Sequence, residues 1–277
     1  MIQPILHYYK IGTHVTAFST TRQGGCSEGS YAEFNINAYC GDNVEHIQHN
    51  RAALCNLLGI TDDRLIMPHQ VHNTRIATIN DSFLHLSAAE RQEELEGVDA
   101  LMTNLPGVCI GVSTADCIPV LLYDADHQAV CAIHAGWRGT VKRIVEKSIA
   151  ALIATYGTRP NDVYAQICPG ISLESFEVGD EVFEAFQQEG FPMDLISKRY
   201  PSDSGGNFST FPSSLYPSKW HINLPECNSL QLLSCGVPET HISVSPICTF
   251  QSHHLFFSAR RLGINSGRIF SGIMLNG

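Results

Sequence analysis

The chain has 277 residues, of which 17 are Lys or Arg and 27 are Asp or Glu, so its formal net charge at pH 7 is −10. This acidic balance argues against a nucleic-acid-binding protein that relies on a broad basic surface. Hydrophobic residues make up 44% of the chain and charged residues 16%, which excludes wholesale disorder and predicts a globular protein.

Targeting and membrane signals are absent from the sequence. The N-terminal residues contain no basic segment followed by an apolar run of signal-peptide length, and no stretch of about 18 uncharged apolar residues occurs anywhere. We therefore expect a cytoplasmic protein with no membrane partner. The ten cysteines form no Cys-x-x-Cys pair, and we expect most of them to be buried thiols in a reducing compartment.

The first predicted elements are a strand and a helix. Residues 14–20 alternate in the manner of a strand and run into a glycine-rich bend. A helix is predicted over 44–58, because its apolar residues share one face and Asp42 and Glu45 have capping-box spacing. Gly59 supplies a left-handed residue that ends this helix.

Segment 97–137 alternates short runs rich in Val and Ile with turn residues, which predicts consecutive strands. An amphipathic helix is predicted over 141–156, with Thr140 as its N-cap and a glycine at its end. A second helix is predicted over 180–189, between two glycines.

The C-terminal third begins with a predicted loop at 201–219, a segment rich in Ser, Pro and Gly. A helix near 224–235, a strand near 241–249 and a last strand at 255–258 are predicted to follow. No linker divides the chain, so we expect a single catalytic domain over residues 1–277.

The hairpin between Cys117 and His134 carries the main chemical hypothesis. If 118–123 and 128–133 are antiparallel strands joined by a loop at 124–127, Cys117 and His134 face each other across the ladder. Opposed residues have Cβ atoms about 4.5–5.5 Å apart, close enough for a thiolate and an imidazole to share one zinc ion. A buried cysteine beside a core histidine is the competing interpretation.

A third ligand is available nearby in the sequence. His69 and His72 point to opposite faces of an extended segment, so we expect one of them to join the pair, and their spacing does not decide which. Cys, His and His would leave the fourth tetrahedral position of zinc open for water, as in catalytic sites.

Several other charged residues are candidates for substrate recognition or proton transfer. Arg138 stands just before a predicted helix, where a guanidinium and free amide groups would stabilise an anion such as phosphate; a structural salt bridge is the equal alternative for this residue. Asp99 and Asp116 are candidates for orienting a ligand histidine or for proton transfer, or they are simple turn acceptors. Arg22 and Arg260 end predicted strands, where binding and solubility roles are both open.

The combination of motifs resembles one known family. The segments that carry the resemblance are Phe18-Ser19-Thr20-Thr21-Arg22-Gln23-Gly24-Gly25, Asn50-Arg51, His69-Gln70-Val71-His72, Val98-Asp99-Ala100, Thr114-Ala115-Asp116-Cys117, His134-Ala135-Gly136-Trp137-Arg138-Gly139-Thr140, Cys248-Thr249 and Phe257-Ser258-Ala259-Arg260-Arg261. They appear in the order found in the YfiH family, once labelled laccase-like multicopper polyphenol oxidase and now described as zinc-dependent purine nucleoside phosphorylase.

The resemblance implies a compact α+β domain with mixed sheets flanked by helices. It also implies that the metal ligands are His72, Cys117 and His134, and that the cofactor is zinc. The implied substrates are phosphate and a purine nucleoside, namely adenosine, inosine or methylthioadenosine, with adenosine deamination as a further activity.

Two rival functions share these residues. A cysteine amidohydrolase that edits peptidoglycan precursors would use Cys117 as nucleophile and His134 as base. A copper-dependent polyphenol oxidase is disfavoured, because multicopper sites draw on His-x-His pairs and none of the 13 histidines lies two positions from another.

Overall fold

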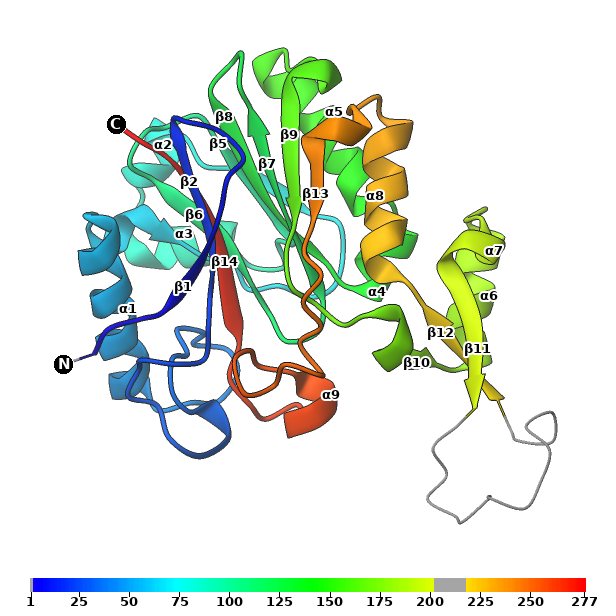
Figure 1. Cartoon of the computed structure of the whole chain (residues 1–277). Coiled ribbons are helices and arrows are strands. Elements are labelled where there is room, and N and C mark those ends of the chain that lie inside the picture. Colours follow the sequence, from blue (N-terminus) through cyan, green and yellow to red (C-terminus); the bar gives the residue numbers. More distant parts are fainter. Residues whose placement is uncertain (1, 202–217) are drawn as a thin grey trace.

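Two β-sheets packed face to face form the centre of the protein, and helices cover their outer faces (Figure 1). The computed structural model describes residues 2–201 and 218–277. Sheet A contains, in spatial order, β1 (Leu6–Tyr9), β2 (Val15–Thr20), β14 (Ile269–Leu275), β6 (Cys109–Thr114) and β3 (Leu65–Ile66). Sheet B contains β13 (Ile242–Val244), β9 (Val163–Ile167), β7 (Ile118–Asp124), β8 (Ala129–Ala135), β5 (Ala100–Thr103) and β4 (Ile76–Thr78). Both sheets mix parallel and antiparallel pairs, which confirms the predicted α+β class.

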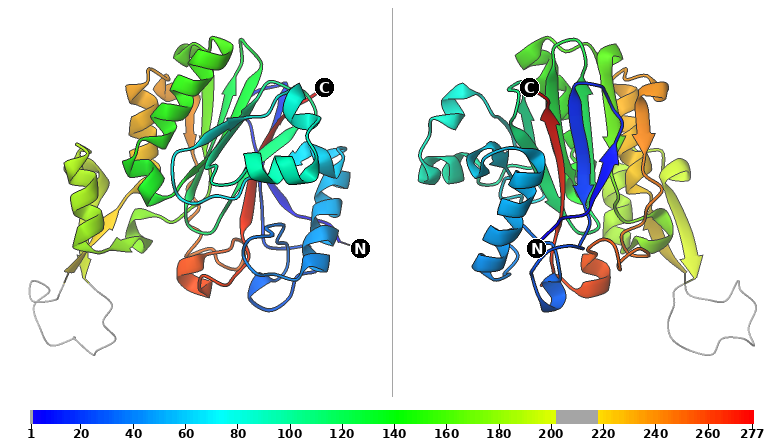
Figure 2. Two further views of the ribbon diagram at one scale, coloured as in Figure 1. Left: turned by 180° about the vertical axis from the view of Figure 1, so that it is seen from behind. Right: turned by 60° about the vertical axis from the view of Figure 1, so that its left-hand side comes forward.

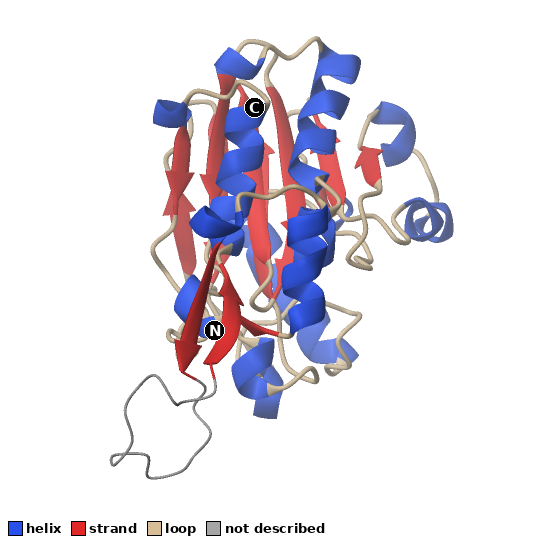
Figure 3. Cartoon of the chain, turned by 90° about the vertical axis from the view of Figure 1, so that its right-hand side faces the viewer, coloured by secondary structure: helices blue, strands red, loops and turns tan. Residues whose placement is uncertain are grey.

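The helices form the outer layers. Helix α1 (Val44–Leu58) packs on sheet A, and the helices α5 (Ile144–Tyr156) and α8 (Leu224–Ser234) pack side by side on sheet B, as Figures 2 and 3 show. Short helices occupy the connections: α2 (Asp81–Leu84), α3 (Ala88–Glu94), α4 (Trp137–Val141) and α9 (Ala259–Leu262). None of the helices in the described part of the chain combines the length and apolar character that crossing a bilayer requires.

A small unit, which we call the side module, projects from the end of sheet B (Figure 1). It consists of β10 (Glu177–Val178), α6 (Asp180–Gln188), α7 (Met193–Ile196), β11 (Ser197–Pro201) and β12 (Ser218–Ile222). Its three strands pair in the order β10-β12-β11 within the described residues. Val182 and Phe186 of α6 belong to the same apolar cluster as the residues of β7 and β8 that face the helices, so the module is anchored to the core.

Side-chain alternation along the central strands explains the layers. In β7, Val120 and Leu122 face the helices on sheet B, whereas Leu121 and Tyr123 face sheet A. All four residues are 3% exposed or less. A strand buried on both faces reads as a continuous apolar run, and each such side chain contributes about 1.5–3 kcal/mol through burial.

The first predicted helix is confirmed as α1, and Gly59 ends it with a φ of 70°. The predicted cap is wrong by one residue. Asn43 is the N-cap, and its side chain accepts a hydrogen bond from the amide of Glu45 at 2.8 Å. The Asp42 carboxylate instead accepts hydrogen bonds from the side chains of Ser27 and Asn35, which fixes the loop before the helix.

The predicted helix 141–156 is broken near its start. Arg143 adopts a left-handed conformation with a φ of 61°, which separates α4 from α5. Thr140 is therefore not an N-cap but part of α4, where its amide donates to the Gly136 carbonyl. The predicted helix at 180–189 is confirmed as α6, which begins after Gly179.

Of the elements predicted in the C-terminal third, the helix is confirmed and the two strands differ from the prediction. Helix 224–235 corresponds to α8, whereas only three residues of the predicted strand at 241–249 form a strand, β13. The predicted last strand at 255–258 is wrong, because Phe256 and Phe257 are buried in a turn that precedes α9. The ends of the predicted loop at 201–219 belong to β11 and β12, and residues 202–217 lie outside the described residues.

The hairpin register differs from the predicted one by two residues. His134 pairs with Pro119 rather than Cys117, and Cys117 lies just before β7. The cause is the turn, where the Asp124 carboxylate accepts the amides of Asp126 and His127 at 3.0 and 3.1 Å and thereby moves the loop by one position. Because side chains alternate with a period of two, this offset leaves Cys117 and His134 on the same face.

Candidate metal centre and active site

His72, Cys117 and His134 converge at one end of the two sheets. One ligand atom from each residue lies within 4.8 Å of the other two, and no other such triad of His, Cys, Asp or Glu occurs in the described residues. The two imidazole rings are 4.7 Å apart between centroids, at an angle of 76°. His134 is buried, Cys117 is half-buried and His72 is exposed, so the group opens to solvent on the His72 side.

Each ligand comes from a different piece of chain. His134 lies near the end of β8, Cys117 directly precedes β7, and His72 lies in the loop between β3 and β4. His72 has a φ of 61°, an unfavourable conformation for a residue with a Cβ. Such a conformation persists only where neighbouring contacts fix it, and these contacts come from Asp99.

Asp99 is fully buried and connects two of the three ligands. Its carboxylate accepts hydrogen bonds from the amides of His72 at 3.0 Å and Asn73 at 2.7 Å, with a longer one of 3.4 Å from Val71. It also bonds His134 Nδ1 at 2.8 Å. Because Nδ1 is engaged by a carboxylate, the Nε2 lone pair of His134 is available as a ligand.

The electrostatics of the group favour an ionised thiol. Burial would raise the pKa of Cys117, but the neighbouring His134 and His72 lower that pKa to about 6. Burial would likewise lower the pKa of His134, but Cys117 and Asp99 raise it to about 9. The Asp99 carboxyl follows the same pattern, because contact with His134 outweighs burial and holds its pKa below the ordinary value. A thiolate is the form of cysteine that binds a metal ion.

Gly136 lies against the ligand group. A Cβ at this position would lie 2.9 Å from His72 Cδ2 and 3.1 Å from Cys117 Sγ. The close approach of the two ligands therefore depends on the absence of a side chain at residue 136.

Replacing Gly136 with alanine is expected to weaken metal binding without unfolding the protein. The Gly136 φ of −67° suits alanine, so the added methyl group acts on the neighbouring ligands rather than on the backbone. We expect a loss of metal affinity of roughly tenfold or more, as for other disturbances of ligand orientation. Titration with zinc, together with the melting temperature of metal-free protein, measures both effects. An unchanged affinity would contradict this account of the site.

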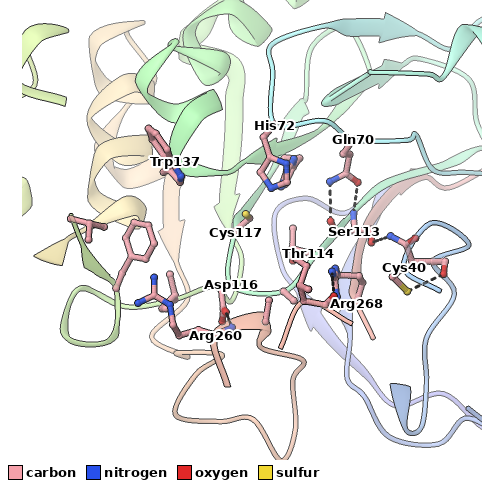
Figure 4. A pocket seen from close by; sticks show the side chains of 18 of the residues that line it. Cys40, Gln70, His72, Ser113, Thr114, Asp116, Cys117, Trp137, Arg260 and Arg268 are labelled. Carbon is pink, nitrogen blue, oxygen red and sulfur yellow. Dashed lines mark hydrogen bonds between the residues drawn. The ribbon is translucent and has the colours of Figure 1, made fainter. Parts of the chain in front are cut away.

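The three ligands open into a cavity of about 760 Å³, a volume typical of small-molecule sites. Its walls come from six parts of the chain: the loops at 37–40 and 69–72, the turn at 113–117, His134 with Trp137, residues 171–182 at and before the side module, and 259–268. In Figure 4 the Cys117 sulfur and the His72 ring lie near the centre of the view. Its lining includes apolar side chains such as Phe176 and Val178 and charged ones such as Arg260 and Arg268.

Two further predicted site residues line the cavity. The Asp116 carboxylate accepts hydrogen bonds from the Thr249 hydroxyl and the Arg260 amide, both at 2.7 Å. Asp116 thus holds the C-terminal segment against the ligand turn. Arg260 donates from both Nη atoms to the carbonyl of Glu177, and its guanidinium lies 5.6 Å from the Phe176 ring.

The other two predicted arginines do not line the cavity. Arg138 is exposed, and its guanidinium lies over the Trp137 ring at 4.3 Å. Helix α4 begins at Trp137, so Arg138 lies inside this helix rather than just before one that starts at residue 141. Arg22 donates to the carbonyls of Ala32 and His253, each at 2.8 Å, and so connects two loops.

Sequence reasoning left His69 and His72 as alternatives and did not single out several cavity residues. His69 lines the cavity but lies outside the ligand group, because its Nδ1 bonds Glu96 at 2.8 Å and its ring stacks on Tyr39. Thr114 and Arg268 also line the cavity. Thr114 stands in the quoted Thr-Ala-Asp-Cys motif, but Arg268 carries no signal in the sequence.

Comparison with characterised proteins places this site in a family. A family model described as multi-copper polyphenol oxidoreductase laccase matches residues 16–276. A protein of Bacteroides thetaiotaomicron named purine nucleoside phosphorylase is 48% identical over 264 residues, which cover 95% of this chain and 93% of the relative. A protein named adenosine deaminase RL5, from an unknown prokaryotic organism, is 41% identical over 268 residues, 97% of each chain.

Solved structures agree with these sequence matches. The crystal structure of YlmD from Geobacillus stearothermophilus has a TM-score of 0.83 and 29% identity, covering 97% of this chain and 94% of that one. That of the hypothetical protein YfiH from Bacillus licheniformis has the same TM-score and identity, covering 95% of this chain and 93% of that one. Since the family model and these relatives each cover nearly the whole chain, the protein belongs to the YfiH family.

Proposed function

We propose that the protein is a zinc-dependent purine nucleoside phosphorylase that also deaminates adenosine. The observation that carries this proposal is a Cys-His-His ligand group that opens into a cavity large enough for a nucleoside. The relatives named purine nucleoside phosphorylase and adenosine deaminase support it. We propose adenosine, inosine and methylthioadenosine as its nucleosides, phosphate as co-substrate and the cytoplasm as its location.

Zinc fits the donor set of the site. A thiolate and two imidazoles are the ligands that this ion prefers, and three protein ligands leave one tetrahedral position open. When bound by His72, Cys117 and His134, zinc would supply a Lewis acid beside the substrate. The ionised Cys117 thiol and the engaged Nδ1 of His134 prepare both side chains for this role.

Phosphorolysis needs an anion site and a place for the leaving base. The bond between C1′ and the purine nitrogen breaks, a C1′–O bond to phosphate forms, and the base leaves with the electron pair and takes up a proton. Phe176 and Val178 provide apolar surface for the purine, and we propose Arg260 as a contact to the nucleoside. In deamination, water adds at C6 of adenosine and ammonia leaves.

The two aspartates have different surroundings in this scheme. Asp99 lies behind His134 and acts as a positioning residue, because its carboxylate reaches no cavity surface and already accepts four hydrogen bonds. Asp116 lines the cavity, and we propose it as the proton carrier. Arg138 and Arg22, the other predicted substrate contacts, have no position on the cavity wall that supports such a role.

Purified protein incubated with inosine and phosphate is expected to release hypoxanthine and ribose 1-phosphate, with no hypoxanthine when phosphate is omitted. Adenosine is expected to yield inosine and ammonia without phosphate. Removal of the metal with a chelator should abolish both activities, and added zinc should restore them. Liquid chromatography of the purines, with elemental analysis of the protein, measures all three results. A complete absence of hypoxanthine, with phosphate as well as without it, would refute the phosphorylase proposal.

A cysteine amidohydrolase is the second candidate, and one observation favours it. The Cys117 thiol, His134 and Asp99 form a chain of contacts in which a base is oriented by a carboxylate, as nucleophilic hydrolases require. Activity in metal-free protein that is lost on alkylation of Cys117 would favour this mechanism. Activity that depends on stoichiometric zinc favours the phosphorylase.

Copper oxidase chemistry has weaker support. Multicopper oxidases bind several ions with many histidines, whereas the described residues of this chain bring only one Cys-His-His group together. We therefore propose that the polyphenol oxidase description of the family model does not give this chain's reaction. Oxygen consumption with a phenol by copper-loaded protein would contradict that view.

A further inference from the structure

The cavity has a polar part that the proposed mechanism does not yet use. Arg268 and Thr114 line it together with Ser113, whose hydroxyl accepts a hydrogen bond from the Asn37 amide. In the view of Figure 4, Arg268 and Arg260 lie on opposite sides of Cys117. The polar part and the apolar part near Phe176 are therefore separate regions of one cavity.

Arg268 brings an uncompensated positive charge to this region. Its Nη1 donates to the carbonyls of Ser266 and Gly267, and its Nη2 donates to the carbonyl of Ile264. In the described chain no carboxylate oxygen lies within 4.0 Å of its guanidinium. A guanidinium has five N–H donors, so Nε–H and one N–H of Nη2 have no acceptor among the described residues. These two groups are the donors that Arg268 has left for an anion.

Thr114 adds an unpartnered hydroxyl to the same region. The residue is 2% exposed, and its Oγ1 is buried with no hydrogen-bond partner in the part of the chain that the structure describes. A buried hydroxyl without a partner destabilises a fold, and because Thr114 lines the cavity, an oxygen of a bound ligand can supply that partner. The Ser113 hydroxyl accepts from Asn37 and retains its own hydrogen for donation.

We propose that Arg268 and Thr114 form the subsite for the phosphate co-substrate, with the Ser113 hydroxyl as a third donor; this inference rests on the proposed phosphorylase function. A phosphate dianion presents oxygens that accept from the remaining N–H groups of Arg268 and from both hydroxyls. The purine then lies in the apolar part of the cavity, and the anomeric carbon lies between the two regions. Arg260 belongs to the nucleoside part of the cavity instead, because its guanidinium lies beside Phe176 and on the other side of Cys117 from Arg268 (Figure 4).

Thr114→Val tests the subsite with the least disturbance, because the replaced hydroxyl makes no hydrogen bond within the described protein. We expect the KM for phosphate in inosine phosphorolysis to rise about tenfold, with a much smaller change in the KM for inosine. Thr158→Val is the matched control, since the Thr158 hydroxyl is also buried and unpartnered among the described residues but lies outside the cavity. An unchanged phosphate KM in Thr114→Val would overturn the proposal.

Arg268→Gln gives a second, larger test. We expect the phosphate KM to rise about 100-fold or more, and the ratio of adenosine phosphorolysis to adenosine deamination to fall, because deamination consumes water instead of phosphate. Arg261→Gln is the control, since Arg261 is an exposed neighbour that does not line the cavity. A ratio that stays at the wild-type value in folded Arg268→Gln would overturn the assignment.

The wild-type activity and the phosphate KM of the variants together distinguish an error in the subsite from an error in the proposed function. If wild-type protein performs no phosphorolysis, the function itself is wrong. If wild-type protein performs it and both variants keep the wild-type phosphate KM, the function stands and the subsite is wrong. The Thr114→Val result decides the case if Arg268→Gln does not fold, because the Arg268 side chain also holds the carbonyls of residues 264, 266 and 267.

Discussion

Replacing Cys117 with serine is expected to remove both the bound metal and the catalytic activity. The substitution exchanges a thiolate whose pKa is lowered to about 6 for a hydroxyl that stays protonated at neutral pH, so the site loses its only anionic ligand. A Lewis acid is worth several kcal/mol of barrier, which predicts a fall in kcat of at least about 100-fold. Elemental analysis and the rate of hypoxanthine release measure the two losses.

Cys235→Ser provides the control for this experiment. Cys235 is a free cysteine of intermediate exposure, as Cys117 is, but it lies at the end of α8 outside the cavity. We expect its variant to retain metal and activity. Full activity in Cys117→Ser with zinc still bound would contradict both roles considered for this thiol, as a metal ligand and as a nucleophile.

Replacing Asp99 with asparagine is expected to weaken zinc binding strongly. The carboxylate accepts three backbone amides and the His134 ring, whereas an asparagine side chain has one oxygen and turns an NH₂ group towards some of these donors. We expect zinc affinity to fall 10–100-fold, the range for partners that orient ligand histidines. Because His72 keeps its left-handed conformation through the same carboxylate, the loop at 71–73 should also loosen.

Asp124→Asn separates positioning of the metal ligands from simple stability. Asp124 is also fully buried and also accepts two backbone amides and a histidine Nδ1, from His127 at 3.0 Å, but it lies in the hairpin turn at the other end of β7. Both variants should lower the melting temperature. Only Asp99→Asn should weaken zinc binding and, on addition of excess zinc, recover activity. Equal zinc affinity in the two variants would contradict a positioning role for Asp99.

Local patterns in the sequence predicted a large part of the fold. The apolar stripe over 44–58 and the following glycine define α1 correctly, because helix periodicity and a left-handed stop are local signals. Strand β14, at the centre of sheet A, was not predicted. It is buried on both faces, so its sequence does not alternate between apolar and polar residues. Phe256 and Phe257 suggested a strand, but their burial depends on contacts with distant residues.

Local signals in the sequence also predicted part of the candidate site. Cys117 and His134 belong to one hairpin, and an error of two residues in its register left both side chains on one face. The reach of Asp99 to the amides around His72 could not be read from the sequence, because it depends on how two distant loops meet. The place of Arg268 in the cavity wall could not be predicted either, because it depends on the folding of 259–268 onto the turn at 113–117.

The division of the cavity between the core and the side module bears on how this family diversifies. The metal ligands belong to the central sheets and their turns, whereas Phe176 and Val178 reach the cavity from the side module and the segment that leads to it. Mutations in that module can reshape the surface that meets the nucleoside while the reacting group keeps its geometry. Substrate preference can therefore change during evolution while the metal ligands are conserved. Relatives that are named for different reactions on purine nucleosides are consistent with this arrangement.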